Sequence, residues 1–230
     1  MHSVDVDSLD VLSLGEICNA NWCLWDPTCL LNDGSLFCCC GASTYIITPA
    51  NIVKPLDSSK YSHESGLVAV NDFVYMFGGQ SNISAKFSLK SENWKALAQY
   101  PVANNLFISC AHFNGNIIIA GSDSNVVLGY NIVNDSFSNI PIELHKLKGK
   151  TCLATDSRCY IIEYGANYYE SGVNNINSWK PIGSANMLNG SWPRHSYNLF
   201  RNESFYFITT NMKLIKFDLK TNQLKLLKIL

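Results

Sequence analysis

Cysteine is the chemically reactive residue type that is most concentrated in this chain. Six of the nine cysteines fall within 23 residues, and these are Cys18, Cys23, Cys29, Cys38, Cys39 and Cys40. Structural zinc sites pair cysteines about two to four residues apart, whereas the first gaps here hold four, five and eight residues. In a strand, Cys38 and Cys40 share one face and Cys39 points to the other, which is poor geometry for tetrahedral ligation. We therefore predict structural, buried cysteines, with metal binding and redox sensing as the less favoured alternatives.

Histidine is the next residue type that could do chemistry, as a metal ligand or as an acid–base catalyst. The five histidines, His2, His63, His112, His145 and His195, share no ligand spacing. His63 is followed by Glu64, but adjacent residues of an extended segment rarely converge on one substrate. We therefore predict no catalytic residue, no metal and no cofactor. His63, Glu64 and His195 are kept only as candidates for a binding surface.

Two segments that contain tryptophan are the strongest candidates for binding. The segment "NANWCLWD" holds Trp22 and Trp25, and "NGSWPRHS" holds Trp192 and Arg194. Exposed aromatic and guanidinium groups are the usual anchors of protein–protein interfaces. The competing interpretation is that these tryptophans are buried between packed sheets, where large aromatic side chains are common.

The composition excludes several classes of partner. The 230 residues carry a net charge of −1, and only 15% are charged, against roughly 25% in typical soluble domains. With no run of like charges, such a surface offers nothing to a nucleic-acid backbone or an anionic membrane. No apolar stretch reaches the ~18 residues of a membrane span, and the start of the chain, which carries three aspartates, lacks the basic residues of a secretion signal. We therefore expect a cytoplasmic protein whose thiols stay reduced.

The elements that would position these residues are predicted from an internal repeat. Five turn pairs between apolar runs lie 39 to 46 residues apart, at Asn32-Asp33, Asn71-Asp72, Asn114-Gly115, Thr155-Asp156 and Arg201-Asn202. Such pairs indicate β-hairpins, most clearly Asn-Gly and Asp-Gly, since type I′ turns need positive φ at both central residues. Helical spacing of apolar residues is not sustained anywhere in the chain.

A second recurrence follows each hairpin. Two apolar or aromatic residues stand seven apart around a polar turn, namely Phe87 and Trp94, Tyr130 and Phe137, and Phe217 and Leu224. Ile46 and Val53 fit more loosely, and in the fourth copy Trp179 has Gly172 in the partner position. Each unit is therefore two hairpins, or four short strands, in about 40 to 46 residues, which is the size of a β-propeller blade.

The best copy carries a family resemblance. In "NDFVYMFGGQ" an apolar strand ends on Gly78 and Gly79, and with Phe87 and Trp94 downstream the unit resembles a kelch repeat. The glycines would stand where the backbone turns sharply and neighbouring blades approach closely. The other copies are degenerate, although "SWPRHSY" at 191–197 resembles the opening of a kelch unit. The resemblance implies an all-β, kelch-like β-propeller whose repeat residues are structural: Gly78, Gly79, Phe87, Trp94, Tyr130, Phe137 and Trp179.

The repeat divides this single propeller domain into five blades and a remainder. The blades are predicted at 20–58, 59–101, 102–143, 144–186 and 187–230. Residues 1–19 are predicted to form an extra outer hairpin, because Val4 and Val11 again stand seven apart with polar residues between them. The two alternatives are a five-bladed ring with that extra hairpin and an incomplete six-bladed ring.

The resemblance implies a non-catalytic protein–protein interaction module or scaffold, because kelch-like propellers commonly bind proteins through loops on one face. The sequence does not identify the partner. The alternative is a carbohydrate-related enzyme or a lectin on a propeller like that of galactose oxidase. We find no constellation of copper ligands, and Arg158, Arg194 and Arg201 are too few for an anion-binding arginine cluster. A polar cluster at the ring axis would favour the enzyme, and an exposed aromatic rim the interaction module.

Overall fold

The computed structural model describes residues 2–4, 11–13, 27–40, 43–56, 64–79, 81–102, 106–122, 124–145, 149–188, 193–209, 211 and 213–229. For residues 2–4, 11–13, 40 and 193–198 it describes the backbone alone. Strands form nearly all the regular structure in these ranges, together with a short 3-10 helix, η1 (Asn186–Leu188). No helix in the described ranges has the length and apolar character needed to cross a bilayer.

Five antiparallel sheets of four strands follow one another along the chain, and within each sheet the strands pair in chain order. Blade 1 has β3 (Thr28–Leu30), β4 (Leu36–Cys40), β5 (Ser43–Ile47) and β6 (Val53–Leu56), and blade 2 has β7 (Gly66–Val70), β8 (Phe73–Phe77), β9 (Ser84–Ser88) and β10 (Asn93–Ala96). Blade 3 has β11 (Ser109–Phe113), β12 (Asn116–Ala120), β13 (Val127–Asn131) and β14 (Ser136–Ile140). Blade 4 has β15 (Lys150–Ala154), β16 (Cys159–Glu163), β17 (Asn167–Gly172) and β18 (Asn175–Ser184), and blade 5 has β19 (Pro193–Arg201), β20 (Ser204–Thr209), β21 (Lys213–Asp218) and β22 (Gln223–Ile229).

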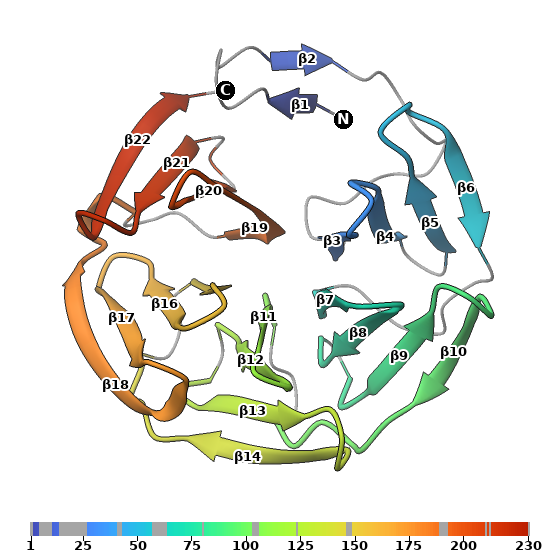
Figure 1. Ribbon diagram of the computed structural model, residues 1–230, viewed down its shortest axis with the longest axis horizontal. Coiled ribbons are helices and arrows are strands. Elements are labelled where there is room, and N and C mark those ends of the chain that lie inside the picture. The colour runs from blue at the N-terminus through green and yellow to red at the C-terminus, as the bar shows by residue number, and fades with distance from the viewer. Residues whose placement is uncertain are drawn as a thin grey trace.

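The five sheets stand around a common axis, with the first strand of each sheet innermost (Figure 1). The inner strands follow one another around the ring: β3 lies beside β7, β7 beside β11, β11 beside β15 and β15 beside β19. The ring closes where β19 lies beside β3. The chain is therefore all-β and forms a five-bladed β-propeller. This confirms the predicted fold class and decides between five and six blades.

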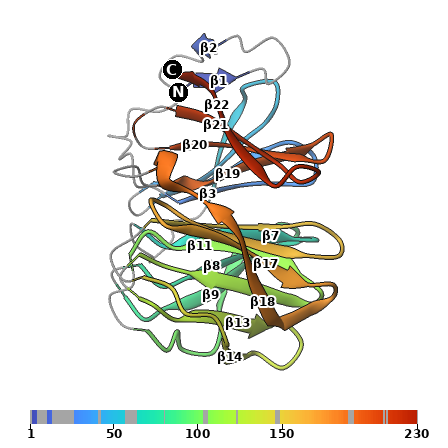
Figure 2. The same ribbon diagram turned by 90° about the vertical axis from the view of Figure 1, so that its left-hand side faces the viewer.

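The antiparallel order gives the propeller two different faces, and Figure 2 shows it edge-on. In every blade the turns between the first and second strands and between the third and fourth strands emerge on the same side, because successive strands reverse direction. We call this side the turn face. It is formed by residues 31–35, 48–52, 71–72, 89–92, 114–115, 132–135, 155–158, 173–174, 202–203 and 219–222. The opposite side, which holds η1 and the other connections, is the connection face.

Aromatic side chains make the contact between neighbouring blades. Phe87 and Trp94 lie directly opposite each other on β9 and β10 and pack on Phe37 of blade 1, with ring centroids 5.1 and 6.1 Å away. Tyr130 of blade 3 packs on Phe77 of blade 2 in the same way, at 5.0 Å. Each such burial contributes about 1.5–3 kcal/mol, and favourable ring geometry adds about 0.5–1.5 kcal/mol. The seven-residue spacing in these two copies therefore marks residues that a blade presents to the blade before it.

The double glycine after β8 lies at one of these contacts. Gly78 and Gly79 have positive φ angles of 63° and 87°, a region that L side chains rarely adopt. A Cβ on Gly78 would lie 2.3 Å from Cδ1 of Ile108 and 2.9 Å from Cε1 of Tyr100. Both neighbours are buried between blades 2 and 3, so neither has room to withdraw. Gly78 is thus required both by the turn and by the close approach of the next blade.

Blades 1 and 5 depart by one residue from the register that the sequence suggested. In blade 1, Val53 lies opposite Ile47 instead of Ile46. The reason is a turn of five residues, 48–52, where blades 2 and 3 use four. In blade 5 the first turn is at Asn202 and Glu203, both with positive φ, one residue later than the predicted Arg201-Asn202 pair.

Blade 4 departs further, because β18 contains a bulge. Trp179 lies opposite Ser171, and the next pair along the ladder joins Gly172 to Asn175. Residues 176–178 therefore have no partner on β17. This insertion explains why the fourth copy looked irregular, with a glycine seven residues before its tryptophan. Extra residues of this kind bend a strand and redirect its side chains.

A separate two-stranded hairpin accompanies the five blades. It consists of β1 (His2–Val4) and β2 (Val11–Ser13), with Val4 opposite Val11. Figure 1 shows it at the rim, in the interval between β22 of blade 5 and β6 of blade 1. Because β19 and β3 lie side by side, the inner ring is closed without the hairpin. The hairpin is an addition to the five blades.

Candidate functional site

Most of the binding residues predicted from the sequence lie outside the described residues. These are Trp22, Trp25, His63 and Trp192, and for Arg194 and His195 only the backbone, in β19, is described. Glu64 is described, with a positive φ of 69°, and its carbonyl accepts a hydrogen bond from the Ile108 N–H at 3.5 Å. A binding surface made of these residues stays a prediction.

The cysteines whose side chains the structure describes are all buried: Cys29, Cys38, Cys39, Cys110, Cys152 and Cys159. Burial raises the pKa of the Cys152 thiol to about 12, against smaller lowering effects of nearby hydrogen bonds and of Lys150, and it raises the pKa of Cys29 and Cys110 as well. In the described ranges, no three His, Cys, Asp or Glu side chains are grouped so that they could hold a metal ion. The raised pKa values keep the thiols of Cys29, Cys110 and Cys152 protonated at neutral pH, as is typical of packing residues.

Blade 4 contains two charged groups that have no exposed surface. Lys150 and Glu163 lie opposite each other on β15 and β16, and both are 0% exposed. The two oxygens of Glu163 accept hydrogen bonds from the backbone N–H and, at 2.8 Å, from Nδ1 of His145. The Lys150 ammonium donates to the His145 carbonyl at 2.8 Å. The cluster fixes the connection from blade 3 to blade 4.

A second charged group in blade 4 is open to solvent. It lines a pocket of about 180 Å³ on the turn face, formed by Arg158, Glu170, Ser171, Gly172, Val173, Ser178, Trp179 and Lys180. Arg158 comes from the turn between β15 and β16, and the other lining residues come from β17, β18 and the turn between them. The bulge at 176–178 contributes Ser178, which has no partner on β17, beside Trp179, which pairs with Ser171. Trp179 is held there by its indole N–H, which donates to the Ile176 carbonyl at 2.7 Å.

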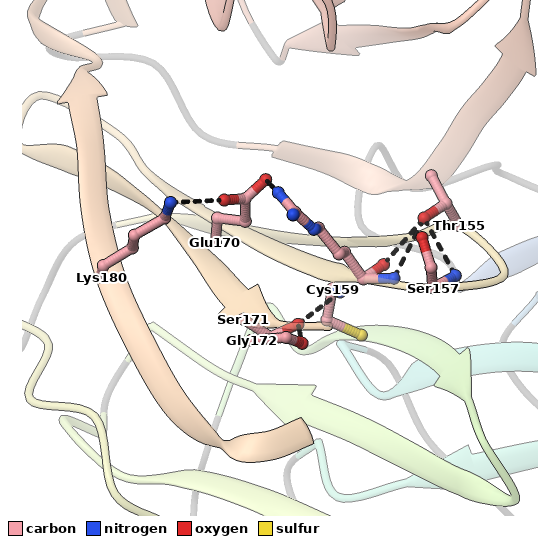
Figure 3. A network of polar contacts seen from close by, with 8 residues as sticks. Thr155, Ser157, Cys159, Glu170, Ser171, Gly172 and Lys180 are labelled. Carbon is pink, nitrogen blue, oxygen red and sulfur yellow. Dashed lines mark hydrogen bonds and ion pairs between the residues drawn. The ribbon is translucent and has the colours of Figure 1, made fainter. Parts of the chain in front are cut away.

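Three charged side chains define the electrostatics of this pocket (Figure 3). Glu170 is nearly buried and accepts hydrogen bonds from Arg158 Nη1 at 2.5 Å and from Lys180 Nζ at 3.2 Å. Its two partners reach solvent: the side chain of Arg158 is 36% exposed and that of Lys180 is 67% exposed. The lining thus holds two cations and one carboxylate, and the carboxylate lies beneath the cations. The surface that a ligand would meet is positive.

Burial and these contacts shift the pKa values in the pocket. Burial opposes ionisation of Glu170, but the hydrogen bonds and charges of Arg158 and Lys180 outweigh it and keep the pKa of Glu170 below its usual value. Burial, followed by the Glu170 charge, raises the pKa of Tyr160 to about 12. At neutral pH the pocket therefore has an ionised Glu170 and a protonated Tyr160. Neither is a proton acceptor poised for acid–base catalysis.

Hydrogen bonds beneath the pocket keep these side chains in place. The Thr155 hydroxyl accepts from the backbone N–H of Arg158 at 3.1 Å and closes the turn that carries the arginine. The Ser171 hydroxyl accepts from the Cys159 N–H at 2.8 Å and donates to the Gly172 carbonyl at 3.0 Å, as Figure 3 shows. The pocket is therefore preorganised by the two strands on which it stands.

The charge pattern predicts how pH acts on stability through Glu170. Because its folded pKa is below the unfolded value of about 4.3, Glu170 stabilises the fold above that pH, and this contribution is lost as pH falls through the folded pKa. We expect Glu170→Gln to lower the free energy of unfolding by about 2 kcal/mol at pH 7. The deficit should shrink steadily below pH ~4. Urea unfolding at several pH values measures this, and a deficit that is the same at pH 7 and pH 3 would contradict it.

The sequence does not predict the pocket, although three of its lining residues stand out in the sequence. Arg158 is one of only three arginines, Gly172 breaks the repeat, and Trp179 is predicted as a structural residue of it. Glu170 and Lys180 are ten residues apart and meet only because they are opposite on neighbouring strands. The irregular fourth copy was the signal that could have directed attention to this blade.

The fold and this site define a five-bladed β-propeller with one irregular blade that carries a preorganised, positively charged pocket. No protein-family model matches the chain, and no similar curated protein is found by sequence. Among solved structures the chain is similar to YjhT, a kelch-repeat protein, with a TM-score of 0.56 and 14% sequence identity. The match covers 73% of this chain and 65% of YjhT. At this identity the similarity concerns the fold alone.

Proposed function

We propose that the protein is a non-catalytic binding module whose partner is another protein, and that its blades are of the kelch type. The observation that carries the proposal is the pocket of blade 4, which presents Arg158 and Lys180 to solvent on a rigid support. Functional residues placed on turns that a rigid scaffold holds are typical of recognition modules. Arginine is also over-represented at the centres of protein interfaces.

Exposed apolar side chains on the same face support a protein partner. Three large apolar residues of the turn face are exposed, Ile52, Val133 and Val173, and the strands that lead to this face add exposed Leu30, Leu199 and Phe200. Leu30 and Phe200 stand near the ends of β3 and β19, which lie side by side, whereas Val173 adjoins the charged pocket. A face that combines apolar groups with a few fixed charges has the composition of an interface with a polar rim.

The alternative of an enzyme draws less support from this pocket. A catalytic carboxylate must be able to exchange a proton with a substrate, but Glu170 already accepts hydrogen bonds from Arg158, Lys180 and Tyr160. Its low pKa also removes it from the range in which a general acid works near neutral pH. The pocket is suited to holding a ligand in place.

The proposal is tested by affinity capture from native extract with the wild type and two matched variants. Val173→Asp places a charge on the turn face, and Met187→Asp does the same to an exposed apolar residue of η1 on the connection face. We expect one set of proteins to be retained by wild type and Met187→Asp and depleted about tenfold by Val173→Asp. Circular dichroism must show that both variants are folded.

Three outcomes would overturn this assignment. Absence of any specifically captured protein would remove the binding module as stated. Loss of partners in Met187→Asp alone would move the interface to the connection face. Capture of glycans without protein would favour the lectin.

A further inference from the structure

We propose that the pocket of blade 4 receives the carboxylate of an acidic side chain from an extended segment of the partner, with an apolar residue next to it in that segment. This inference rests on the proposed function, because it specifies the chemistry of the same site.

The charge of the pocket calls for one negative group. Arg158 and Lys180 contribute two positive charges and Glu170 one negative charge, so the lining has a single excess positive charge. A carboxylate cancels this excess, whereas a phosphate monoester, with about −1.5 to −2 charges, would leave the site negative. A neutral group would leave the excess positive charge of Arg158 and Lys180 uncancelled, because Glu170 supplies only one negative charge.

Both cations have hydrogen-bond donors left for a ligand. A guanidinium has five N–H donors and an ammonium three. In the pocket Arg158 contacts Glu170 and Tyr160, and Lys180 contacts Glu170 at 3.2 Å. Because Glu170 holds both cations from below, little conformational entropy is lost when a ligand binds. The side chain of Lys180 is 67% exposed, so its remaining donors are accessible to a ligand.

The volume and the wall residues of the pocket indicate how large the ligand is and what lies next to its carboxylate. About 180 Å³ is well below the ~300–1,000 Å³ of sites for drug-sized molecules, so the pocket fits one side chain. Val173 is 56% exposed beside it, and Trp179 forms another wall. An apolar residue adjacent to the acidic one would cover Val173 while the carboxylate meets the cations. This pairing distinguishes a peptide from a free carboxylate ion.

The test is a titration of the full chain by nuclear magnetic resonance, followed at the indole N–H of Trp179. The probes are three hexapeptides with uncharged, blocked ends, and free glutarate. The first peptide is Gly-Gly-Glu-Leu-Gly-Gly, and in the other two the Glu is replaced by Gln or by phosphoserine. We expect the Glu-Leu peptide to shift the indole signal in the millimolar range and the Gln-Leu peptide to bind about tenfold more weakly. Binding should also weaken as salt is raised, because both cations are exposed.

A matched pair of variants separates the pocket from general positive charge. Lys180→Gln removes a lysine that lies 3.2 Å from Glu170, and Lys216→Gln removes one that lies 3.2 Å from Asp218 in blade 5. We expect Lys180→Gln to weaken Glu-Leu binding about tenfold or more and Lys216→Gln to leave it unchanged. Equal losses in the two variants would show non-specific attraction and overturn the proposal.

Other results overturn it in different ways. Equal affinity for the Gln-Leu peptide, or no response up to about 10 mM peptide, would exclude carboxylate recognition. Preference for the phosphoserine peptide would assign a phosphate site, and equal affinity for glutarate would assign a small-molecule site. If protein capture depends on Val173 while no peptide binds, this inference fails and the proposed function stands. Loss of capture together with peptide binding would reject the function and keep the carboxylate site.

Discussion

Replacing Gly78 by alanine is expected to lower the free energy of unfolding by about 3 to 4 kcal/mol. Roughly 1–2 kcal/mol of this comes from placing a Cβ at positive φ, and the φ of Gly78 is 63°. A further ~1–3 kcal/mol comes from forcing side chains apart in a filled core. The new methyl group would overlap Ile108 and Tyr100, which are both 1% exposed.

Gly115 is the matched control, because it has the same backbone requirement without the contact. Its φ is 71°, and a Cβ there would meet nothing within 4 Å. Gly115→Ala should therefore cost only the conformational part, about 1–2 kcal/mol. Urea denaturation of the two variants, with equal m-values, measures the difference. Equal costs would mean that blades 2 and 3 do not approach each other at Gly78 as described.

Replacing Glu163 by glutamine is expected to cost about 3 to 5 kcal/mol. The side chain is fully buried and accepts hydrogen bonds from the backbone N–H and Nδ1 of His145. Glutamine would turn an N–H₂ group toward one of those donors and would leave the fully buried Lys150 opposite a neutral residue. Loss of a fully buried, hydrogen-bonded carboxylate is one of the few causes of a loss this large.

An exposed ion pair provides the control for the Glu163→Gln substitution. Lys54 and Glu92 form an ion pair in which both side chains are about half exposed. Glu92→Gln should change the free energy of unfolding by no more than about 1 kcal/mol. Thermal and urea unfolding of both glutamine variants would test this contrast. A loss below about 1 kcal/mol for Glu163→Gln would show that Lys150 has other compensation and that the cluster is not essential.

Much of the fold was predictable because propeller blades are specified by local signals. Asn114-Gly115 adopts positive φ at both residues, as its sequence predicts, and Phe87 lies opposite Trp94 because the four-residue turn between their strands sets the register. Turn chemistry and seven-residue spacing both lie within a few residues, so the sequence alone carries them. Counting these signals left five and six blades open, because the outer hairpin at residues 1–19 fits either ring, and the contact of β19 with β3 decided for five.

The candidate site was not predictable in the same way, because it depends on residues that meet across strands. Residues 175–178 read "NINS", which resembles a further turn, and nothing in those four letters indicates that three of them bulge from a continuing strand. Glu170 looked like an isolated acid, since Arg158 and Lys180 are twelve and ten residues away in sequence. The pocket depends on the register between β17 and β18, and tertiary packing decides that register.

The bulge in β18 also concerns how such a protein can change over evolutionary time. The pocket adjoins three residues of one outer strand, 176–178, that have no partner on β17, and the ladder shifts register again between Tyr168 and Tyr169. In repeat architectures each unit contacts only its neighbours, so an insertion or deletion at a blade's edge is absorbed locally. A propeller of this kind can therefore gain, lose or relocate a recognition site through a single short indel. The other four blades would keep their structure. The outer hairpin of each blade is therefore a suitable place to insert residues that change binding specificity.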